Sequence, residues 1–253
     1  MGILTEKMAL EVVGEFKNEL CAVDCDGILA IYLVGSLGGG YYRPGQSDID
    51  TAIILRDDAA ITQEEIENIA DRYRDKYQVP KGFGAMAIYE KELFPPYSKS
   101  EAEEFEFSVE IARLKVQGKL IYGNYCLDQV PIPSREHLIQ DAVIMERWLQ
   151  SEFGYPIYNK LSITASINCI LSVMRRYLMI EHGIFEFNKF KTIDAYLRSS
   201  PSVVDEAVFE FINGYLHGTV VGDAESLEMI QRFGTVISDH YNEQLLGGIF
   251  FDS

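Results

Sequence analysis

The chain has 253 residues, of which 47% are hydrophobic, and this suits one large domain or two modest ones. Its formal net charge is −17. This acidity argues against general binding to nucleic acids or anionic membranes, because both need clustered Lys and Arg. It is compatible with a cationic small molecule as a partner, since an acidic surface attracts cations.

The cysteines and the N-terminus indicate the compartment. Four scattered cysteines in a chain of this size favour reduced thiols over a disulfide framework. Cys21 and Cys25 share a face of a predicted helix, but no His or further Cys lies near them in sequence to complete a zinc site. The start of the chain lacks the pattern of a signal peptide, and no apolar run has membrane-spanning length. We therefore expect a cytoplasmic protein with no membrane partner.

The first half of the chain alternates predicted helices and strands. A helix over residues 5–24 is predicted from an N-cap at Thr5 and from apolar residues at four-residue spacing. These apolar residues are Met8, Val12, Phe16 and Leu20. The elements predicted after it are strands 28–34, 49–55, 83–89 and 119–122, and helices 62–77 and 101–115. This alternation predicts a domain that combines α and β structure.

The pattern changes at residues 130–133, Val-Pro-Ile-Pro, where two prolines stiffen the connection. Strand signals stop after this point. Helical periods run through residues 135–152, 162–182, 190–198, 202–216 and 224–245. We therefore expect two domains, residues 1–130 and residues 131–253, of which the second is an all-α helical bundle.

The most informative stretch joins the first two predicted strands. Gly35 ends the first strand and lets another group approach the backbone, and Ser36 can cap a following helix whose N–H groups would bind an anion. Asp48 and Asp50 lie two residues apart at the next strand, so both point to one side of it. Mg²⁺ uses one or two carboxylates together with phosphate oxygens. The stretch suits nucleotidyl transfer; the alternative is a glycine-rich turn with a surface Asp pair.

Residues 34–50 also carry a family resemblance. Val-Gly-Ser, a glycine-rich middle, Arg-Pro and then Ser-Asp-Ile-Asp resemble the DNA polymerase β-like nucleotidyltransferase superfamily. In detail they resemble the aminoglycoside adenylyltransferases that modify streptomycin and spectinomycin. The resemblance implies an α+β domain with a nucleotidyltransferase-type mixed sheet. It also implies that Asp48 and Asp50 are the catalytic, metal-binding residues, with Gly35, Ser36 and Ser47 around the phosphates of ATP.

Three later pieces resemble the same adenylyltransferases, in the same order along the chain. They are Asn168 to Arg175, Gly183 to Lys189, and Gly214 to Leu216. The resemblance implies that Lys189 and Tyr215 reach across a cleft to the ATP phosphates, so that the helical domain closes the site. A lysine charge and a phenol donor suit a triphosphate. Read alone, Lys189 is a surface lysine and Tyr215 a packing residue, while Arg175 could pair with a carboxylate or cap a helix.

Two features of these adenylyltransferases are missing. They carry an acid near the start of the third strand, which completes the metal site or acts as general base, but this strand begins Lys-Gly-Phe-Gly at residues 81–84. Glu90 at the far end of that strand and Glu146 on a later helix are possible substitutes. The acid that contacts the antibiotic is also missing, because residues 165–167 are Ala-Ser-Ile. The nucleotide half of the site is thus better preserved than the acceptor half.

We therefore predict Mg²⁺-dependent transfer of AMP from ATP to a hydroxyl of a small-molecule acceptor, with aminoglycosides as candidates. The alternative is a non-catalytic nucleotide-binding or antitoxin-like protein, which the missing acid favours and the Asp pair opposes. A polynucleotide-modifying transferase would need a basic stripe that the sequence lacks. Arg176 and His182 also match the loose spacing of some helical ribonuclease modules, although His182 is read more simply as a helix cap.

Overall fold

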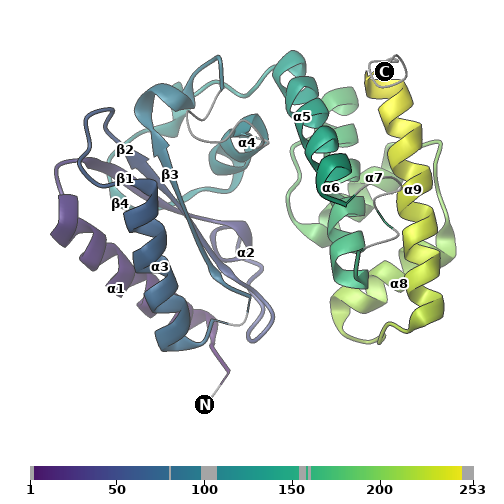
Figure 1. The fold of residues 1–253 in the computed structure, drawn as a ribbon, viewed down its shortest axis with the longest axis horizontal. Coiled ribbons are helices and arrows are strands. Elements are labelled where there is room, and N and C mark those ends of the chain that lie inside the picture. Colours follow the sequence, from purple (N-terminus) through teal and green to yellow (C-terminus); the bar gives the residue numbers. More distant parts are fainter. Residues whose placement is uncertain (1–2, 80, 98–106, 154–157, 159–160, 247–253) are drawn as a thin grey trace. The chain divides into compact units, whose positions relative to one another are not determined.

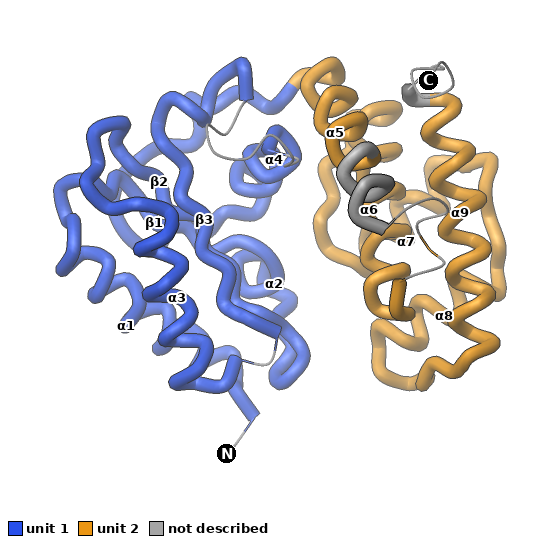
Figure 2. The backbone as a smooth tube through the Cα atoms, in the orientation of Figure 1, with its two compact units in different colours: residues 1–101, 107–133 blue, residues 102–106, 134–253 orange. Residues whose placement is uncertain are grey.

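The computed structural model describes residues 3–79, 81–97, 107–153, 158 and 161–246 (Figure 1). The chain separates into two compact units, with the border between residues 133 and 134 (Figure 2). Each unit has its own apolar core.

Unit 1 is built on a four-stranded sheet in the order β3-β2-β1-β4. β1 (Ile28–Val34) runs antiparallel to β2 (Ile49–Leu55) and to β4 (Lys119–Gly123), whereas β3 (Phe83–Tyr89) runs parallel to β2. The parallel pair is joined through helix α3 (Gln63–Tyr77). The sheet is therefore mixed, as the resemblance implied.

Helices cover both faces of this sheet (Figure 1). α1 (Glu6–Asp24) and α3 pack on one face with Ile31 and Ile53, and α4 (Phe107–Gln117) packs on the other with Ile54. Burial on both faces explains why β1 and residues 52–55 of β2 are continuous apolar runs. The short elements are α2 (Gly35–Gly38) and the 3-10 turns η1 (Glu90–Leu93) and η2 (Leu127–Gln129).

Most of the predicted elements of unit 1 are found. β1, β2 and β3 have the predicted bounds, and Thr5 caps α1 by accepting from the Met8 N–H at 3.3 Å. Of the four apolar residues that predicted this helix, Met8 lies outside the core and is 41% exposed, because the buried face of α1 uses Ala9 and Val13 as well as Val12, Phe16 and Leu20. The predicted helix 101–115 begins outside the described residues and is seen from Phe107 onward.

Unit 2 is an all-α bundle, as predicted. Its helices are α5 (Arg135–Phe153), α6 (Ile163–His182), α7 (Lys189–Arg198), α8 (Glu206–His217) and α9 (Ala224–Leu246). α6 packs against α5, α7 and α9 and supplies several of the core side chains. In the described part of the chain, only α6 is long and apolar enough to cross a membrane. Its burial in the bundle accounts for that apolar composition.

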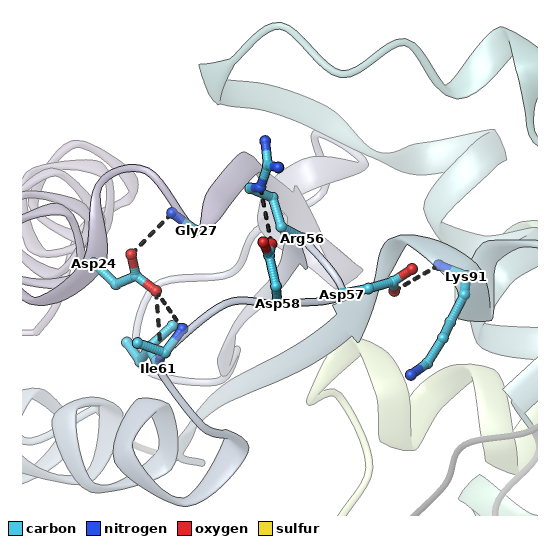
Figure 3. A network of polar contacts seen from close by, with 8 residues as sticks. Asp24, Gly27, Arg56, Asp57, Asp58, Ile61 and Lys91 are labelled. Carbon is cyan, nitrogen blue, oxygen red and sulfur yellow. Dashed lines mark hydrogen bonds and ion pairs between the residues drawn. The ribbon is translucent and has the colours of Figure 1, made fainter.

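A polar network fastens the end of α1 to the loop before α3 (Figure 3). One carboxylate oxygen of Asp24 accepts from the Gly27 N–H at 2.9 Å, and the other accepts from Ala60 at 2.8 Å and from Ile61 at 3.2 Å. The bond from Gly27, followed by those from Ile61 and Ala60, lowers the pKa of the Asp24 carboxyl. Three backbone segments therefore depend on one ionised side chain.

We expect Asp24→Asn to lower the free energy of unfolding, because the new NH₂ group cannot accept hydrogen bonds from the backbone. The loss should be only about 1 kcal/mol, since solvent screens a carboxylate at the surface. The pKa of Asp24 is lower in the folded state, so its contribution is present above its unfolded pKa and is lost as pH falls toward the folded value. Urea unfolding of both proteins between pH 7 and pH 3 measures this difference. It should narrow below about pH 4, and a difference that stays constant to pH 3 would contradict the assignment. Asp26→Asn, at the exposed neighbouring acid, is the control.

Candidate functional site

The carboxylate of Asp50 lies against two glycines, one on each side of β2. Asp50 is paired with Gly84 on β3 and with Val34 on β1, which Gly35 directly follows. An ideal Cβ placed on Gly84 would lie 2.8 Å from Asp50 Oδ1, and one placed on Gly35 would collide with Oδ2. Gly35 also has a φ of +58°, a backbone conformation that favours glycine. The close approach expected at Gly35 is therefore an approach of Asp50.

Asp48 directly precedes β2, and both aspartates are partly exposed. Ile49 between them is completely buried in the core, so the alternation of the strand directs Asp48 and Asp50 away from that core. Burial first, and then the nearby charge of Asp48, raise the pKa of the Tyr42 hydroxyl. The start of β2 thus presents two carboxylates on one side.

Ser36 has a different position from the one expected. It lies inside α2 as its second residue, the N-cap is Val34, and no side chain caps this helix. The prediction that Ser36 caps α2 is therefore wrong. Within the described part of the chain, its Oγ is buried and has no hydrogen-bond partner. A buried hydroxyl without a partner costs about 1–3 kcal/mol, so this group is suited to a ligand that bonds to it.

Ser47 closes the glycine-rich loop between β1 and β2. Its Oγ accepts from the Arg43 N–H at 3.0 Å, and its own N–H donates to the Arg43 carbonyl at 2.9 Å. A hydroxyl that accepts a hydrogen bond still has its own proton to donate. Ser47 therefore shapes the loop that brings Asp48 to β2 and retains a donor.

The donor set at the start of β2 fits a hard divalent cation. Two carboxylates suit Mg²⁺, which keeps several water or phosphate ligands and needs no cage of protein side chains. Among the residues that the structure describes, no three His, Cys, Asp or Glu side chains form a metal cluster. The fit therefore rests on Asp48 and Asp50 with non-protein oxygens completing the shell.

The structure argues against both proposed substitutes for the missing third acid. The register pairs Asp50 with Gly84 and Leu55 with Tyr89, so Glu90 lies beyond the opposite end of β3, about 20 Å along the strand from Gly84. Its charge acts there on Arg56 and Tyr125. Glu146 is 3% exposed inside unit 2, where its charge acts on Tyr158. Glu90 is therefore wrong as a base for this site, and the burial of Glu146 argues against it.

The ribonuclease-like pair is also separated by burial. Arg176 is 6% exposed, and its charge acts on the buried Tyr158. His182 is exposed at the last turn of α6 and contacts the ring of Tyr177 with centroids 5.0 Å apart. The helix ends at Gly183, whose left-handed conformation and N–H close it. The two side chains therefore do not share one exposed site.

The two phosphate-binding residues expected in unit 2 are both partly exposed, and α6 contacts both of them. Lys189 is the first residue of α7, and its Nζ donates to Asn168 Oδ1 at 3.1 Å. Tyr215 lies on α8, and its hydroxyl is 2.7 Å from Thr164 Oγ1. Arg175, whose role the sequence left open, donates to the Phe187 carbonyl at 3.1 Å. It therefore ties α6 to the segment before α7.

Known proteins share parts of this fold. The family model of the nucleotidyltransferase domain matches residues 13–108, a range that includes β1, α2, β2 and β3. The structure is similar to a crystal structure of the spectinomycin adenyltransferase AAD(9) from Enterococcus faecialis with ATP and spectinomycin. That match has a TM-score of 0.62 and 16% sequence identity, and covers 92% of this chain and 99% of the other.

Two toxin–antitoxin structures match a smaller part of the fold. One was determined with AMP-PNP and matches at TM-score 0.29 and 17% identity, covering 58% of this chain and 98% of the other. The second is a mutant of the toxin–antitoxin MntA-HpeT, at TM-score 0.28 and 18% identity, covering 59% and 98%. No curated protein sequence matches the chain. Residues 13–108 thus match the nucleotidyltransferase domain family, and the chain has a fold similar to that of the spectinomycin adenyltransferase.

Proposed function

We propose that the protein is a cytoplasmic Mg²⁺-dependent enzyme that transfers AMP from ATP to a hydroxyl of a small-molecule acceptor. An aminoglycoside is the first acceptor to test, because a structural relative was determined with ATP and spectinomycin. The observation that carries the proposal is the Asp50 carboxylate between Gly35 and Gly84, two residues after Asp48.

In this proposal residues 1–130 bind the nucleotide and the metal. Asp48 and Asp50 hold Mg²⁺, which neutralises charge that develops on the phosphate chain. The Ser36 hydroxyl, buried and unpartnered within the described residues, donates to a phosphate oxygen, and Ser47 donates from the end of the loop. Gly35 lets the Asp50 carboxylate lie against the backbone at the end of β1.

Residues 131–253 form the second domain of the proposed enzyme. Lys189 supplies a positive charge and Tyr215 a hydroxyl donor to the same phosphate chain. Both groups are partly exposed and are oriented by side chains of α6. Their charge and donor capacity complement the acidic metal site of the first domain.

A second candidate function is nucleotide binding without transfer, as in an antitoxin-like protein. The specific observation in its favour is Gly84, which occupies the strand position beside Asp50 and has no side chain to act as a base. A general base contributes about 10²–10⁴-fold to a rate. Turnover therefore separates the two candidates, because both bind Mg²⁺-ATP and only the enzyme releases pyrophosphate.

We expect Asp50→Asn to lower pyrophosphate release by at least about 10²-fold, because the variant loses a charged metal ligand. The assay contains Mg²⁺, ATP and a panel of aminoglycosides. Glu90→Gln is the matched control and should keep full activity, since Glu90 lies at the other end of β3. Full activity of Asp50→Asn would overturn the metal role.

Thermal unfolding with ATP shows which candidate applies if no aminoglycoside is modified. A ligand at 100 times its Kd stabilises the folded state by about 2.7 kcal/mol. Stabilisation that depends on Mg²⁺ and on Asp50, without pyrophosphate release from any acceptor, would support the nucleotide-binding protein. The absence of both stabilisation and turnover would refute both candidates.

We also expect Gly35→Ala to abolish the Mg²⁺-dependent stabilisation by ATP, because the new methyl group would displace the Asp50 carboxylate. Gly40→Ala is the matched control: Gly40 also has a positive φ, of +74°, but its added Cβ meets nothing within 4 Å. Both variants share a backbone strain of about 1–2 kcal/mol. Equal stabilisation of the two variants by Mg²⁺-ATP would show that the Gly35–Asp50 contact is unimportant for binding.

A further inference from the structure

One face of α6 holds two side chains that come from two other helices. Asn168 Oδ1 accepts from Lys189 Nζ at 3.1 Å, and Thr164 Oγ1 lies 2.7 Å from the Tyr215 hydroxyl. Thr164 and Asn168 are four residues apart and therefore lie on the same face, separated by about 6 Å along the helix axis. α6 thus aligns a cation from α7 with a phenol from α8.

The backbone that carries Lys189 is fixed from the same helix. Arg175 lies seven residues beyond Asn168, two turns along the same face. Its guanidinium donates to the Phe187 carbonyl at 3.1 Å and to Thr192 Oγ1 at 3.4 Å. The Thr192 hydroxyl donates in turn to the Asn188 carbonyl at 2.9 Å. The start of α7 is therefore attached to α6 on both sides of Lys189.

The contact with Asn168 orients Lys189 and adds no charge of its own. The Asn168 amide is neutral, whereas a carboxylate in its place would compensate the ammonium group. The contact between Thr164 and Tyr215 joins two hydroxyls, each able to donate or accept. When Thr164 donates, the Tyr215 proton is left for an acceptor outside the protein. This arrangement suits an anion that meets both groups.

We propose that Asn168 and Thr164 are positioning residues, which hold Lys189 and Tyr215 in place for the phosphate chain of the nucleotide. The inference rests on the proposed function, because it takes that chain to be the ligand of both groups. A lysine side chain has about 2 kcal/mol of rotamer entropy. Ordering it before the ligand arrives reduces the entropy lost on binding and so tightens the complex.

The test is calorimetric titration of the full chain with the Mg²⁺ complex of α,β-methylene-ATP, whose carbon bridge between the α- and β-phosphorus atoms prevents transfer of AMP. Asn168→Ala and Thr164→Val should each raise Kd about 3- to 10-fold. The matched controls remove the same groups from partly buried sites on neighbouring helices, Asn213→Ala on α8 and Thr235→Val on α9. Both controls should leave Kd unchanged. Thermal unfolding of each variant without ligand shows whether the fold is kept.

Asn168→Asp separates a positioning role from a purely structural one. The aspartate keeps an acceptor for Lys189 Nζ at nearly the same volume, so the fold should be retained. It also neutralises the lysine and repels the triphosphate, so Kd should rise more than in Asn168→Ala. An Asn168→Asp variant that binds the nucleotide as tightly as the unchanged protein would overturn the proposal.

Lys189→Ala and the double variant Asn168→Ala/Lys189→Ala complete the design. If Asn168 acts through Lys189, the double variant should bind no more weakly than Lys189→Ala alone, because the two effects are not additive. If Lys189→Ala binds the nucleotide analogue more weakly while Asn168→Ala binds it with unchanged Kd, the positioning role is refuted and the proposed function stays intact. An unchanged Lys189→Ala would refute both the assigned role of Lys189 and this inference, while the Asp50 variants test the metal site separately.

Discussion

The position of the Asp50 carboxylate depends on strand pairing rather than on side-chain packing. β2 has an antiparallel neighbour on one side and a parallel neighbour on the other, and the two registers place Val34 and Gly84 beside Asp50. The parallel pair requires a crossover, which α3 supplies, and the antiparallel pair requires the loop that begins at Gly35. The topology of unit 1 thus determines which backbone atoms surround this carboxylate.

In unit 2 the partly exposed Lys189 and Tyr215 lie on separate helices, so their positions depend on how those helices pack. A single helix, α6, contributes both to the buried core of the bundle and to the polar face that contacts these residues. Its apolar side chains fix where α7 and α9 pack, and Thr164 and Asn168 then orient groups that would otherwise sample many rotamers. The apolar stripe and the polar row of α6 therefore depend on each other.

Local patterns predicted the elements well, and non-local contacts account for the errors. β1, β2 and β3 were predicted with their observed bounds, because each is an apolar run with a clear break at one or both ends. The sequence shows that the third strand begins without an acid, but only the register shows that Gly84 occupies the place beside Asp50 and that Glu90 is at the far end. Likewise, nothing in the sequence indicates that Asn168 contacts Lys189, 21 residues later. The helical cap expected at Ser36 failed because the chain already turns at Gly35.

The surroundings of Asp50 have a consequence for how this protein can evolve. Neither of the two glycines can take a side chain without meeting the Asp50 carboxylate, so these two positions have little room for substitution. Substitutions that keep this carboxylate in place must then accumulate elsewhere, such as in the loops and helices farther from β2. A lineage descended from this chain could diversify at those positions while the two glycines beside Asp50 stayed the same.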